Sequence, residues 1–437
     1  MRLTGQVPRV VVIEVTNTLQ AASVTGYQRF VREFVRELRR PGSPALDVVP
    51  VVWDAPGDCY RRLTAAEDRA MTTMAPDRVP VAARSLARER LRAALQHPAA
   101  APARRGVRAW RHRSTREQRS LRLVTLPTGA VFFDAEPAWH DPRPRSELLP
   151  ALRAQGLTVV TMVADVLPQQ HPEWFEPRVA AAFGDWLSAH LASSQLALAI
   201  SEHTRGALQA VAESRGLPPP PTQVVQLGAD FAGTLTGAPE GRAVDLPPAI
   251  GRFLLVVGTL EPRKNHALAL EVFTRLAAEH PDLGLVLVGK QGWLVEPLVE
   301  KVRTHPLYGT RLLWLSGLGD GELSWLFQHA YLALVPSWSE GLGLPLIEAL
   351  RYGVPAVAST GGALPEAGGP AAELVAPDDV DAWTEAVRRH LEDPGHHGQA
   401  RARAAAYQPP TWEAAGQAVR RALADAGHSV PARQDGS

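Results

Sequence analysis

The sequence PSWSEGLGLPLIEAL occupies residues 336–350 and directly follows a short apolar run, Leu332–Val335. The apolar run is typical of a buried strand, and the glycines after it indicate a loop before a helix. Glu340 falls in this loop, and Glu348 falls about two turns inside the helix. Ligands of open α/β sheets bind where strands end and helices begin, so both carboxylates are expected to face one cleft. The helix N-terminus between them offers unpaired backbone N–H groups that suit a phosphate.

Short β-branched runs alternate with longer helical patterns along the whole chain, which predicts an α/β fold of parallel βαβ units. The expected strands are Val10–Val15, Val48–Trp53, Ala130–Phe133, Leu157–Val163, Leu196–Ile200, Val224–Leu227, Phe253–Val257, Gly284–Val288, Arg311–Leu315, Leu332–Val335, Pro355–Ala358 and Ala372–Val375. Apolar residues on one face predict a helix over Tyr27–Arg39, and Ser201 is expected to cap the helix after it. The Gly- and Pro-rich residues 228–248 indicate a linker between two similar halves.

Composition limits the class of protein. A chain of 437 residues exceeds one ordinary core and predicts two domains. The net charge of +1 gives no global field that would attract nucleic acid. The one cysteine, Cys59, cannot form an internal disulfide, and no apolar run approaches the roughly 18 residues of a membrane span. These features favour a cytoplasmic protein that at most touches a membrane.

More glycine-containing turns follow predicted strands in the second half. They are Val257–His266 (VGTLEPRKNH), Val288–Trp293, Gly317–Asp320 and Gly361–Glu366. In the first of these turns, Arg263 and Lys264 stand where a helix begins, although cations are unfavourable at a helix N-terminus. Their position therefore favours binding of an anionic ligand over an ordinary basic helix start.

These motifs, in this order and spacing, resemble those of the retaining glycosyltransferases of family 4, which have the GT-B fold. The residues Glu14–Thr16 and Thr25–Phe30 also look like the opening of bacterial surface-polysaccharide members. The resemblance implies two Rossmann-like domains that face each other across a cleft. The expected parts are an acceptor-side domain at 1–240 with an Arg/Ala-rich insertion at about 60–122, a nucleotide-sugar-binding domain at 249–410, a C-terminal helix at 411–427 that packs back on the first domain, and a disordered tail at 428–437.

The resemblance implies that the active site contains two cations and a carboxylate. Glu340 would accept hydrogen bonds from the donor sugar, and Lys264 occupies the position of the family's phosphate lysine. The arginine that usually follows Gly258 in the family is replaced by Thr259, so Arg263 is expected to supply that charge. Such cations stabilise the departing diphosphate without Mg²⁺.

The acceptor side departs from the family pattern. Ala164 stands where many members have a histidine, which leaves Asp165 as the candidate that orients or deprotonates the acceptor. Capping of the turn before Pro168 is its alternative role. His140 and His171 are further candidates for the base, and same-face attack with the leaving phosphate taking the proton would need no strong base.

The expected donor-binding residues belong to the glycine turns and the following helix. Glu348 would bind the ribose, and the other expected contacts are Gly26, Gly258, Gly341, Gly343, Leu344, Gly289 and Leu318. Trp293 is either a stacking platform for the base or a core residue. No metal is expected: residues 378–381 are better interpreted as a helix cap than as an acidic metal site, and no His/Cys cluster has zinc spacing.

The expected function is transfer of a hexose from a nucleotide diphosphate sugar to a glycan or lipid-linked acceptor in cell-surface polysaccharide biosynthesis. No cofactor is expected beyond this donor substrate. The Glu261–Asn265 turn resembles that of one branch of the family, and this resemblance favours mannose on GDP and leaves UDP-linked sugars open. A GT-B sugar-nucleotide epimerase and a non-catalytic nucleotide-binding partner in glycan assembly remain alternatives.

The segment Arg61–Arg122 interrupts the alternating pattern and is rich in Ala and Arg. It is interpreted either as solvated helices or as a basic face for peripheral contact with anionic lipid at the inner face of the cell membrane. Nucleic-acid binding is a third alternative, but no recognition motif accompanies the arginines.

Overall fold

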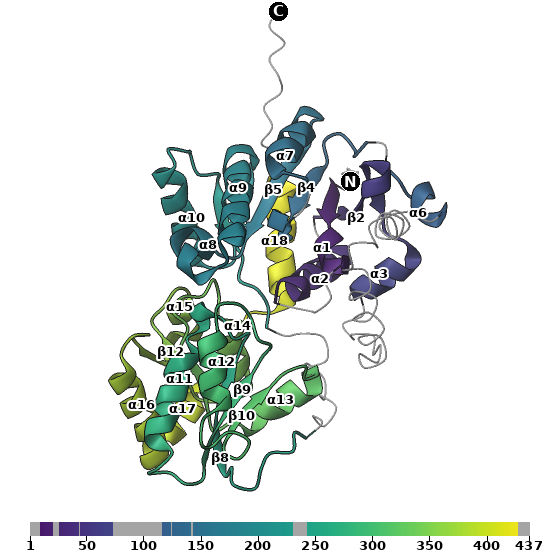
Figure 1. Ribbon diagram of the computed structural model, residues 1–437. Helices are drawn as coiled ribbons and strands as arrows, with labels where there is room; N and C mark the ends of the chain where they lie inside the picture. The colour runs from purple at the N-terminus through teal and green to yellow at the C-terminus, as the bar shows by residue number, and fades with distance from the viewer. Residues whose placement is uncertain are drawn as a thin grey trace, which may run out of the picture. The chain divides into compact units, whose positions relative to one another are not determined.

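The computed structural model describes residues 9–20, 26–42, 44–72, 116–123, 125–140, 143–229 and 243–426. The chain divides into two compact units. Unit 1 comprises Met1–Asp141, Pro150–Val160 and Arg420–Ser437, and unit 2 comprises Pro142–Leu149 and Thr161–Val419. The fold is of the predicted α/β class, with helices packed around two separate sheets (Figure 1).

The first sheet has seven strands in the order β3-β2-β1-β4-β5-β6-β7. The strands are β1 Arg9–Glu14, β2 Leu46–Asp54, β3 Cys59–Arg62, β4 Val131–Asp134, β5 Thr158–Val163, β6 Leu196–Ala199 and β7 Thr222–Val224. Strand β3 was not predicted, and it pairs antiparallel with β2 at the sheet edge. The prediction of a strand over Val224–Leu227 was wrong, because β7 begins directly after the proline run 218–221 and ends at Val224.

The second sheet has six strands in the order β10-β9-β8-β11-β12-β13 and is parallel throughout. The strands are β8 Arg252–Val257, β9 Leu283–Val288, β10 Leu312–Leu315, β11 Leu332–Val335, β12 Ala356–Ser359 and β13 Ala372–Val375. Strands β9, β11 and β12 are buried along their whole length, which explains why they are continuous apolar runs. The carboxyl ends of β8 and β11 are adjacent, since the two strands pair directly.

Helices connect the strands in both halves. Those of the first half are α1 Thr16–Gln20, α2 Gly26–Arg39, α3 Ala65–Thr72, α6 Arg116–Ser120, α7 Arg145–Ala154, α8 Leu167–Gln170, α9 Pro177–Ser193 and α10 Glu202–Ser214. Those of the second half are α11 His266–Leu276, α12 Glu296–Arg303, α13 Asp320–His329, α14 Leu344–Arg351, α15 Leu364–Gly368, α16 Val380–Glu392, α17 Pro394–Ala405 and α18 Trp412–Ala426. The predicted cap at Ser201 is confirmed, because its side chain accepts a hydrogen bond from the Thr204 amide at 3.0 Å.

The end of the last helix, from Arg420 on, belongs to unit 1. Arg420 of α18 is 4% exposed and donates to the carbonyls of Glu37 at 3.1 Å and Leu38 at 2.8 Å. It also donates to the carbonyl of Arg40 at 2.7 Å. The last carbonyls of a helix have no partner within the helix, so Arg420 satisfies the C-terminal end of α2. The predicted tail 428–437 lies outside the described residues.

The Arg/Ala-rich insertion is described only at its two ends. Residues 73–115 lie outside the described part of the chain. Arg61 forms an ion pair with Glu67 at 2.7 Å, and Arg122 forms one with Asp54. These two arginines therefore stabilise the first sheet's edge and are not part of an open basic face. In the described ranges, no helix is both long enough and apolar enough to span a bilayer.

Candidate functional site

The candidate site of unit 2 lies where β8 and β11 end. Strand β11 leads through residues 336–343 into α14, and β8 leads through a short 3₁₀ turn, Pro262–Lys264, into α11. The amide of Trp338 donates to the carbonyl of Arg263 at 2.8 Å, which ties the two loops together. Neighbouring parallel strands end on the same edge of a sheet, so segments distant in sequence meet here.

Glu340 is the centre of an ion-pair cluster. One carboxylate oxygen accepts from Arg263 Nη1 at 2.7 Å, and the other pairs with Lys264 Nζ. The hydroxyl of Ser337 donates to the second oxygen at 2.7 Å. The carboxylate is 5% exposed, and a buried carboxylate of this kind needs such partners. The structure therefore brings three predicted site residues, Glu340, Arg263 and Lys264, into direct contact.

The charges of this cluster fix its protonation. Burial alone would raise the pKa of Glu340, but Arg263 and Lys264 outweigh it and hold the pKa at about 2. For Arg263, burial lowers the pKa, while Glu340 and Glu261 outweigh it and raise the pKa above its ordinary value. Glu340 is therefore ionised at neutral pH. It can accept hydrogen bonds from sugar hydroxyls but cannot serve as a general acid.

Sequence reasoning missed two members of the cluster. Glu261 is 5% exposed, and its carboxylate lies 2.7 Å from Arg263 Nε. The guanidinium of Arg263 is thus held between two carboxylates, Glu261 and Glu340. Ser337 is the other missed residue. Its position three residues before Glu340 indicates that its hydroxyl can reach the Glu340 carboxylate, as it does in the structure.

The N-terminus of α14 has the geometry of an anion-binding end. Gly343 precedes the helix with φ of +86°, a conformation that strongly favours glycine. The amide of Leu344, the first helical residue, has no acceptor within the described chain. It therefore remains available to a ligand at the positive end of the helix.

Glu348 does not lie as deep in α14 as predicted. The helix begins at Leu344, so Glu348 is four residues, or about one turn, inside it. The side chain is partly exposed, whereas its neighbours Ile347 and Ala349 are buried. A partly exposed carboxylate between buried neighbours fits a ligand contact, although the glutamate has other interactions in the structure.

Asp165 lies two residues before the short helix α8, near the cluster. Its carboxylate accepts from the amide of Leu167 at 3.1 Å, which is the capping role weighed against catalysis. Burial raises the pKa of Asp165, and Arg263 and the Leu167 amide oppose that shift. The influence of Arg263 places Asp165 within electrostatic reach of the site.

Gly341 allows the chain to pass close to the residue before Asp165. A Cβ atom added at Gly341 would lie 2.1 Å from the carbonyl oxygen of Ala164. The carbonyl of Gly341 also accepts from Ser201 Oγ at 2.7 Å. Both contacts lie within unit 2 and leave no room for a side chain at this position.

The remaining predicted donor contacts lie at strand ends. Gly258 and Gly289 directly follow β8 and β9, and Leu318 lies partly exposed between β10 and α13. The carbonyl of Gly289 already accepts from Trp314 Nε1 at 2.8 Å. In unit 1, Gly26 is the exposed first residue of α2.

Two aromatic candidates have structural partners. Trp293 Nε1 donates to the carbonyl of Trp174 at 2.8 Å, and its ring stacks with Phe175. This arrangement favours the packing role of Trp293 over base stacking. His171 stacks on Trp174 at 3.9 Å and contacts Glu173, so it gains no support as a catalytic base.

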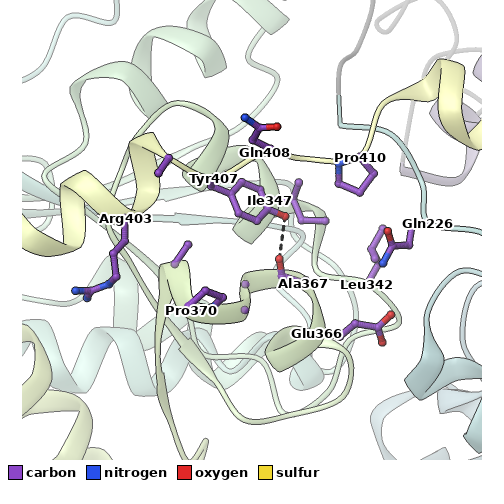
Figure 2. Close-up of a pocket in the computed structure, with 14 residues that line it drawn as sticks. Gln226, Leu342, Ile347, Glu366, Ala367, Pro370, Arg403, Tyr407, Gln408 and Pro410 are labelled. Carbon is purple, nitrogen blue, oxygen red and sulfur yellow. Dashed lines mark hydrogen bonds between the residues drawn. The ribbon is translucent and has the colours of Figure 1, made fainter.

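A cavity of about 490 Å³ lies on another side of the α14 region (Figure 2). It is lined by Leu342, Ile347, Glu366 and Tyr407, among others, and the Tyr407 hydroxyl donates to the Ala367 carbonyl at 2.8 Å. None of Glu340, Arg263 and Lys264 lines it. The cavity is therefore separate from the ion-pair cluster.

Comparison with known proteins identifies the second half of the chain. Residues 242–427 match the profile of the family described as glycosyl transferases group 1. The serotype-specific mannosyltransferase WbdA of Escherichia coli is 36% identical over 215 residues, which are 47% of this chain and 26% of that protein. The O-antigen chain mannosyltransferase B of Escherichia coli is 37% identical over 158 residues, 35% of this chain and 40% of that protein. The chain thus matches less than half the length of either relative.

A solved structure resembles the chain over nearly its whole length. The crystal structure of Anabaena Alr3699/HepE in complex with UDP and glucose has a TM-score of 0.58 at 14% identity, and the match covers 95% of this chain and 100% of that chain. At this identity the likeness concerns the fold alone, and the chain has the GT-B fold. The predicted resemblance to family 4 glycosyltransferases is confirmed by these comparisons.

Proposed function

We propose that the chain is a retaining hexosyltransferase, because residues 242–427 match the family of glycosyl transferases group 1. It would move a hexose from a nucleotide diphosphate sugar to a glycan or lipid-linked acceptor in cell-surface polysaccharide biosynthesis. The chain matches less than half the length of the two relatives, so their activity cannot simply be transferred to it. The proposed activity is therefore inferred from the site. The observation that carries the proposal is the carboxylate of Glu340 held by Arg263 and Lys264.

The reaction needs charge stabilisation on the leaving diphosphate. Lys264 pairs with Glu340, which lies in the loop that leads into α14. We assign Lys264 and the amide of Leu344 to the diphosphate, because fixed cations and helix N-termini stabilise negative charge as it develops. No catalytic metal is required by this assignment.

Glu340 and Arg263 have different tasks in this scheme. Glu340 stays ionised and accepts hydrogen bonds from the donor sugar, which orients its anomeric carbon. The guanidinium of Arg263 forms ion pairs with both Glu261 and Glu340. Arg263 therefore acts mainly as a positioning residue that fixes the Glu340 carboxylate. Asp165 is assigned to the acceptor side, within electrostatic reach of Arg263.

The donor is proposed to be mannose on GDP, with UDP-linked hexoses as the alternative. Both E. coli relatives are named mannosyltransferases, and their matches lead us to favour this sugar. Thermal-shift measurements with GDP-mannose, UDP-glucose, GDP and UDP test the choice. A ligand that binds only the folded protein raises its melting temperature by an amount that grows with the ratio of its concentration to its dissociation constant. At equal concentrations, GDP-mannose should therefore give the largest shift.

Turnover is tested by following nucleotide release with and without a mannan acceptor. Release that depends on the acceptor, with an α-linked product by NMR, supports transfer with retention. Formation of an epimer from the donor alone would instead indicate an epimerase, and donor binding without any turnover would indicate a non-catalytic partner. Glu340→Gln should abolish acceptor-dependent release while still melting cooperatively.

We also propose that the enzyme is cytoplasmic and contacts the inner face of the cell membrane through its Arg/Ala-rich insertion. The support is the sequence of residues 73–115, with its arginine clusters. Co-sedimentation with vesicles that contain anionic lipid tests this contact. Equal binding by a variant lacking residues 73–115, or no binding by the full chain, would refute it.

A further inference from the structure

Three potential metal ligands converge in the second half of unit 2, away from the ion-pair cluster. Glu373 belongs to the edge strand β13, His390 to the last turn of α16 and His396 to the first turn of α17. Their nearest ligand atoms all lie within 4.8 Å of one another. The two helices are joined by Asp393, which ends α16 and caps α17 by accepting from the amide of His396 at 3.0 Å.

The distances suit a small divalent cation. Glu373 Oε2 lies 3.3 Å from His390 Nε2 and 3.0 Å from His396 Nε2. Zinc bonds of about 2.0–2.1 Å in a tetrahedral arrangement separate neighbouring ligand atoms by about 3.3 Å. The carboxylate oxygen and the two imidazole nitrogens therefore lie near the positions of three corners of a tetrahedron.

His390 provides an independent sign of a missing partner. Its side chain is completely buried, and Nε2 forms no hydrogen bond in the described structure. Its other nitrogen, Nδ1, lies 3.3 Å from Nδ1 of His397. When Nδ1 carries the proton and donates it to His397, the lone pair of Nε2 points toward the Glu373 carboxylate. In this tautomer two acceptors face each other 3.3 Å apart, and either a proton or a metal cation has to lie between them.

We propose that Glu373, His390 and His396 form a binding site for a divalent transition-metal ion, with Zn²⁺ as the occupant. Two imidazoles and one carboxylate are a ligand set that zinc commonly uses. The side chains of Glu373 and His396 are each 20% exposed, so an ion can enter and a water molecule can complete the coordination. Bound zinc would fasten the junction of α16 and α17 to the edge of the second sheet.

The surroundings orient the ligands without occupying the site. Arg389 Nη1 lies 3.8 Å from Oε1 of Glu373 and leaves Oε2 to the ion. The contact of His390 with His397 fixes the ring through its second nitrogen, as metal-bound histidines usually require. The site does not touch the residues assigned to sugar transfer, so it changes nothing in the metal-independent scheme.

The chain offers a matched control for this proposal. Glu279, His280 and Glu392 form a second group of potential ligands, in which both carboxylates are exposed. It contains a single histidine, and His280 Nε2 lies 3.4 Å from Glu392. One imidazole with two solvated carboxylates is a poorer zinc site, so His280→Gln should leave zinc binding unchanged.

The test uses the untagged full-length chain after treatment with chelator. Zinc bound after desalting is measured by mass spectrometry of the metal, and affinity by competition with a zinc-sensitive dye. We expect one zinc ion per wild-type chain and an affinity reduced at least about 100-fold in His396→Gln and in Glu373→Gln. Co²⁺ should give the visible spectrum of a tetrahedral ion in the wild type and lose it in both variants.

Each outcome decides the proposal. Failure of the wild type to bind zinc, or equal binding by wild type and His396→Gln, would overturn it. Loss of binding in His280→Gln would move the site to the second group. Circular dichroism checks the fold of the variants. Anomalous diffraction at the zinc edge from wild-type crystals locates the ion without any substitution, and a peak away from Glu373 would also reject the assignment.

Discussion

Lys264 and Glu340 form an ion pair although 76 residues separate them in the sequence. Lys264 follows β8 and Glu340 follows β11, and these two strands pair directly in the second sheet. The sheet topology therefore builds the site, since neither loop alone contains both charges. The first prediction concerns this pair.

Replacement of Lys264 by Ala should lower kcat/KM for sugar transfer at least about 100-fold, because a cation that stabilises the leaving diphosphate is lost. Nucleotide release in the presence of acceptor measures the effect. Lys301→Ala is the control, since Lys301 is exposed on α12 and should tolerate the change. Equal activity of the two variants would remove Lys264 from the mechanism.

Replacement of Arg263 by Met should destabilise the protein by about 3 kcal/mol or more, because it leaves Glu261 and Glu340 buried without their shared cation. Urea unfolding followed by circular dichroism gives the free energy of unfolding. Arg275→Met is the comparison, because Arg275 forms ion pairs at the surface of α11, and exposed ion pairs contribute little to stability. A similar small loss in both variants would contradict the structural role of the cluster.

Gly341→Ala should destabilise unit 2, because the added Cβ would lie 2.1 Å from the Ala164 carbonyl oxygen. Gly206→Ala makes the same chemical change in α10, where nothing lies within 4 Å. That substitution should instead stabilise the protein by up to about 1 kcal/mol, since alanine is the better helix former. Thermal melting of the two variants is expected to shift in opposite directions, and shifts of the same sign would disprove the close approach.

His266 should make stability depend on pH. Burial, with Lys264 as a second cause, lowers its pKa from 6.5 to about 3 and outweighs a contact with the Gly258 backbone that favours the charged form. Between these two values the unfolded chain binds a proton that the folded chain rejects. Stability is therefore retained above pH 6.5 and falls as the pH decreases toward 3, by up to about 1.4 kcal/mol per pH unit.

The difference between two variants isolates this effect. Urea unfolding between pH 7.5 and 4.5 should show a smaller loss of stability in His266→Leu than in the wild type. His329→Leu changes an exposed histidine on α13 and should follow the wild-type curve. Parallel curves for wild type and His266→Leu would refute the prediction.

Local patterns predicted most of the second sheet. Strands Leu332–Val335 and Ala372–Val375 have the predicted bounds, because each is a short apolar or β-branched run between turn residues. Strand Cys59–Arg62 was not predicted, because it contains two arginines and pairs antiparallel at an edge, without an apolar run to mark it. An apolar run is what marks a strand in the sequence, and Cys59–Arg62 has none although Tyr60 and Arg61 are buried.

Contacts of the site that follow from the order of strands in the sheet were predicted. Contacts that depend on the direction of a side chain were missed. The meeting of Lys264 with Glu340 follows from two strand ends on one sheet edge. The return of Arg263 toward Glu261 does not, because two residues that are close in sequence can point either way. The Glu373–His396 contact also escaped detection, since these residues are 23 positions apart and no spacing rule connects them.

The position of Arg420 has a consequence for how the protein is made. Its bonds to Glu37 and Leu38 join positions 383 and 382 residues apart, so the carbonyls at the end of α2 cannot bond to Arg420 until residue 420 has been synthesised. During translation this helix end must stay hydrated or be shielded by a chaperone, and unit 1 completes its folding late. Ribosome-bound chains stopped before residue 420 should accordingly be cut by protease within residues 37–44 more readily than the released protein.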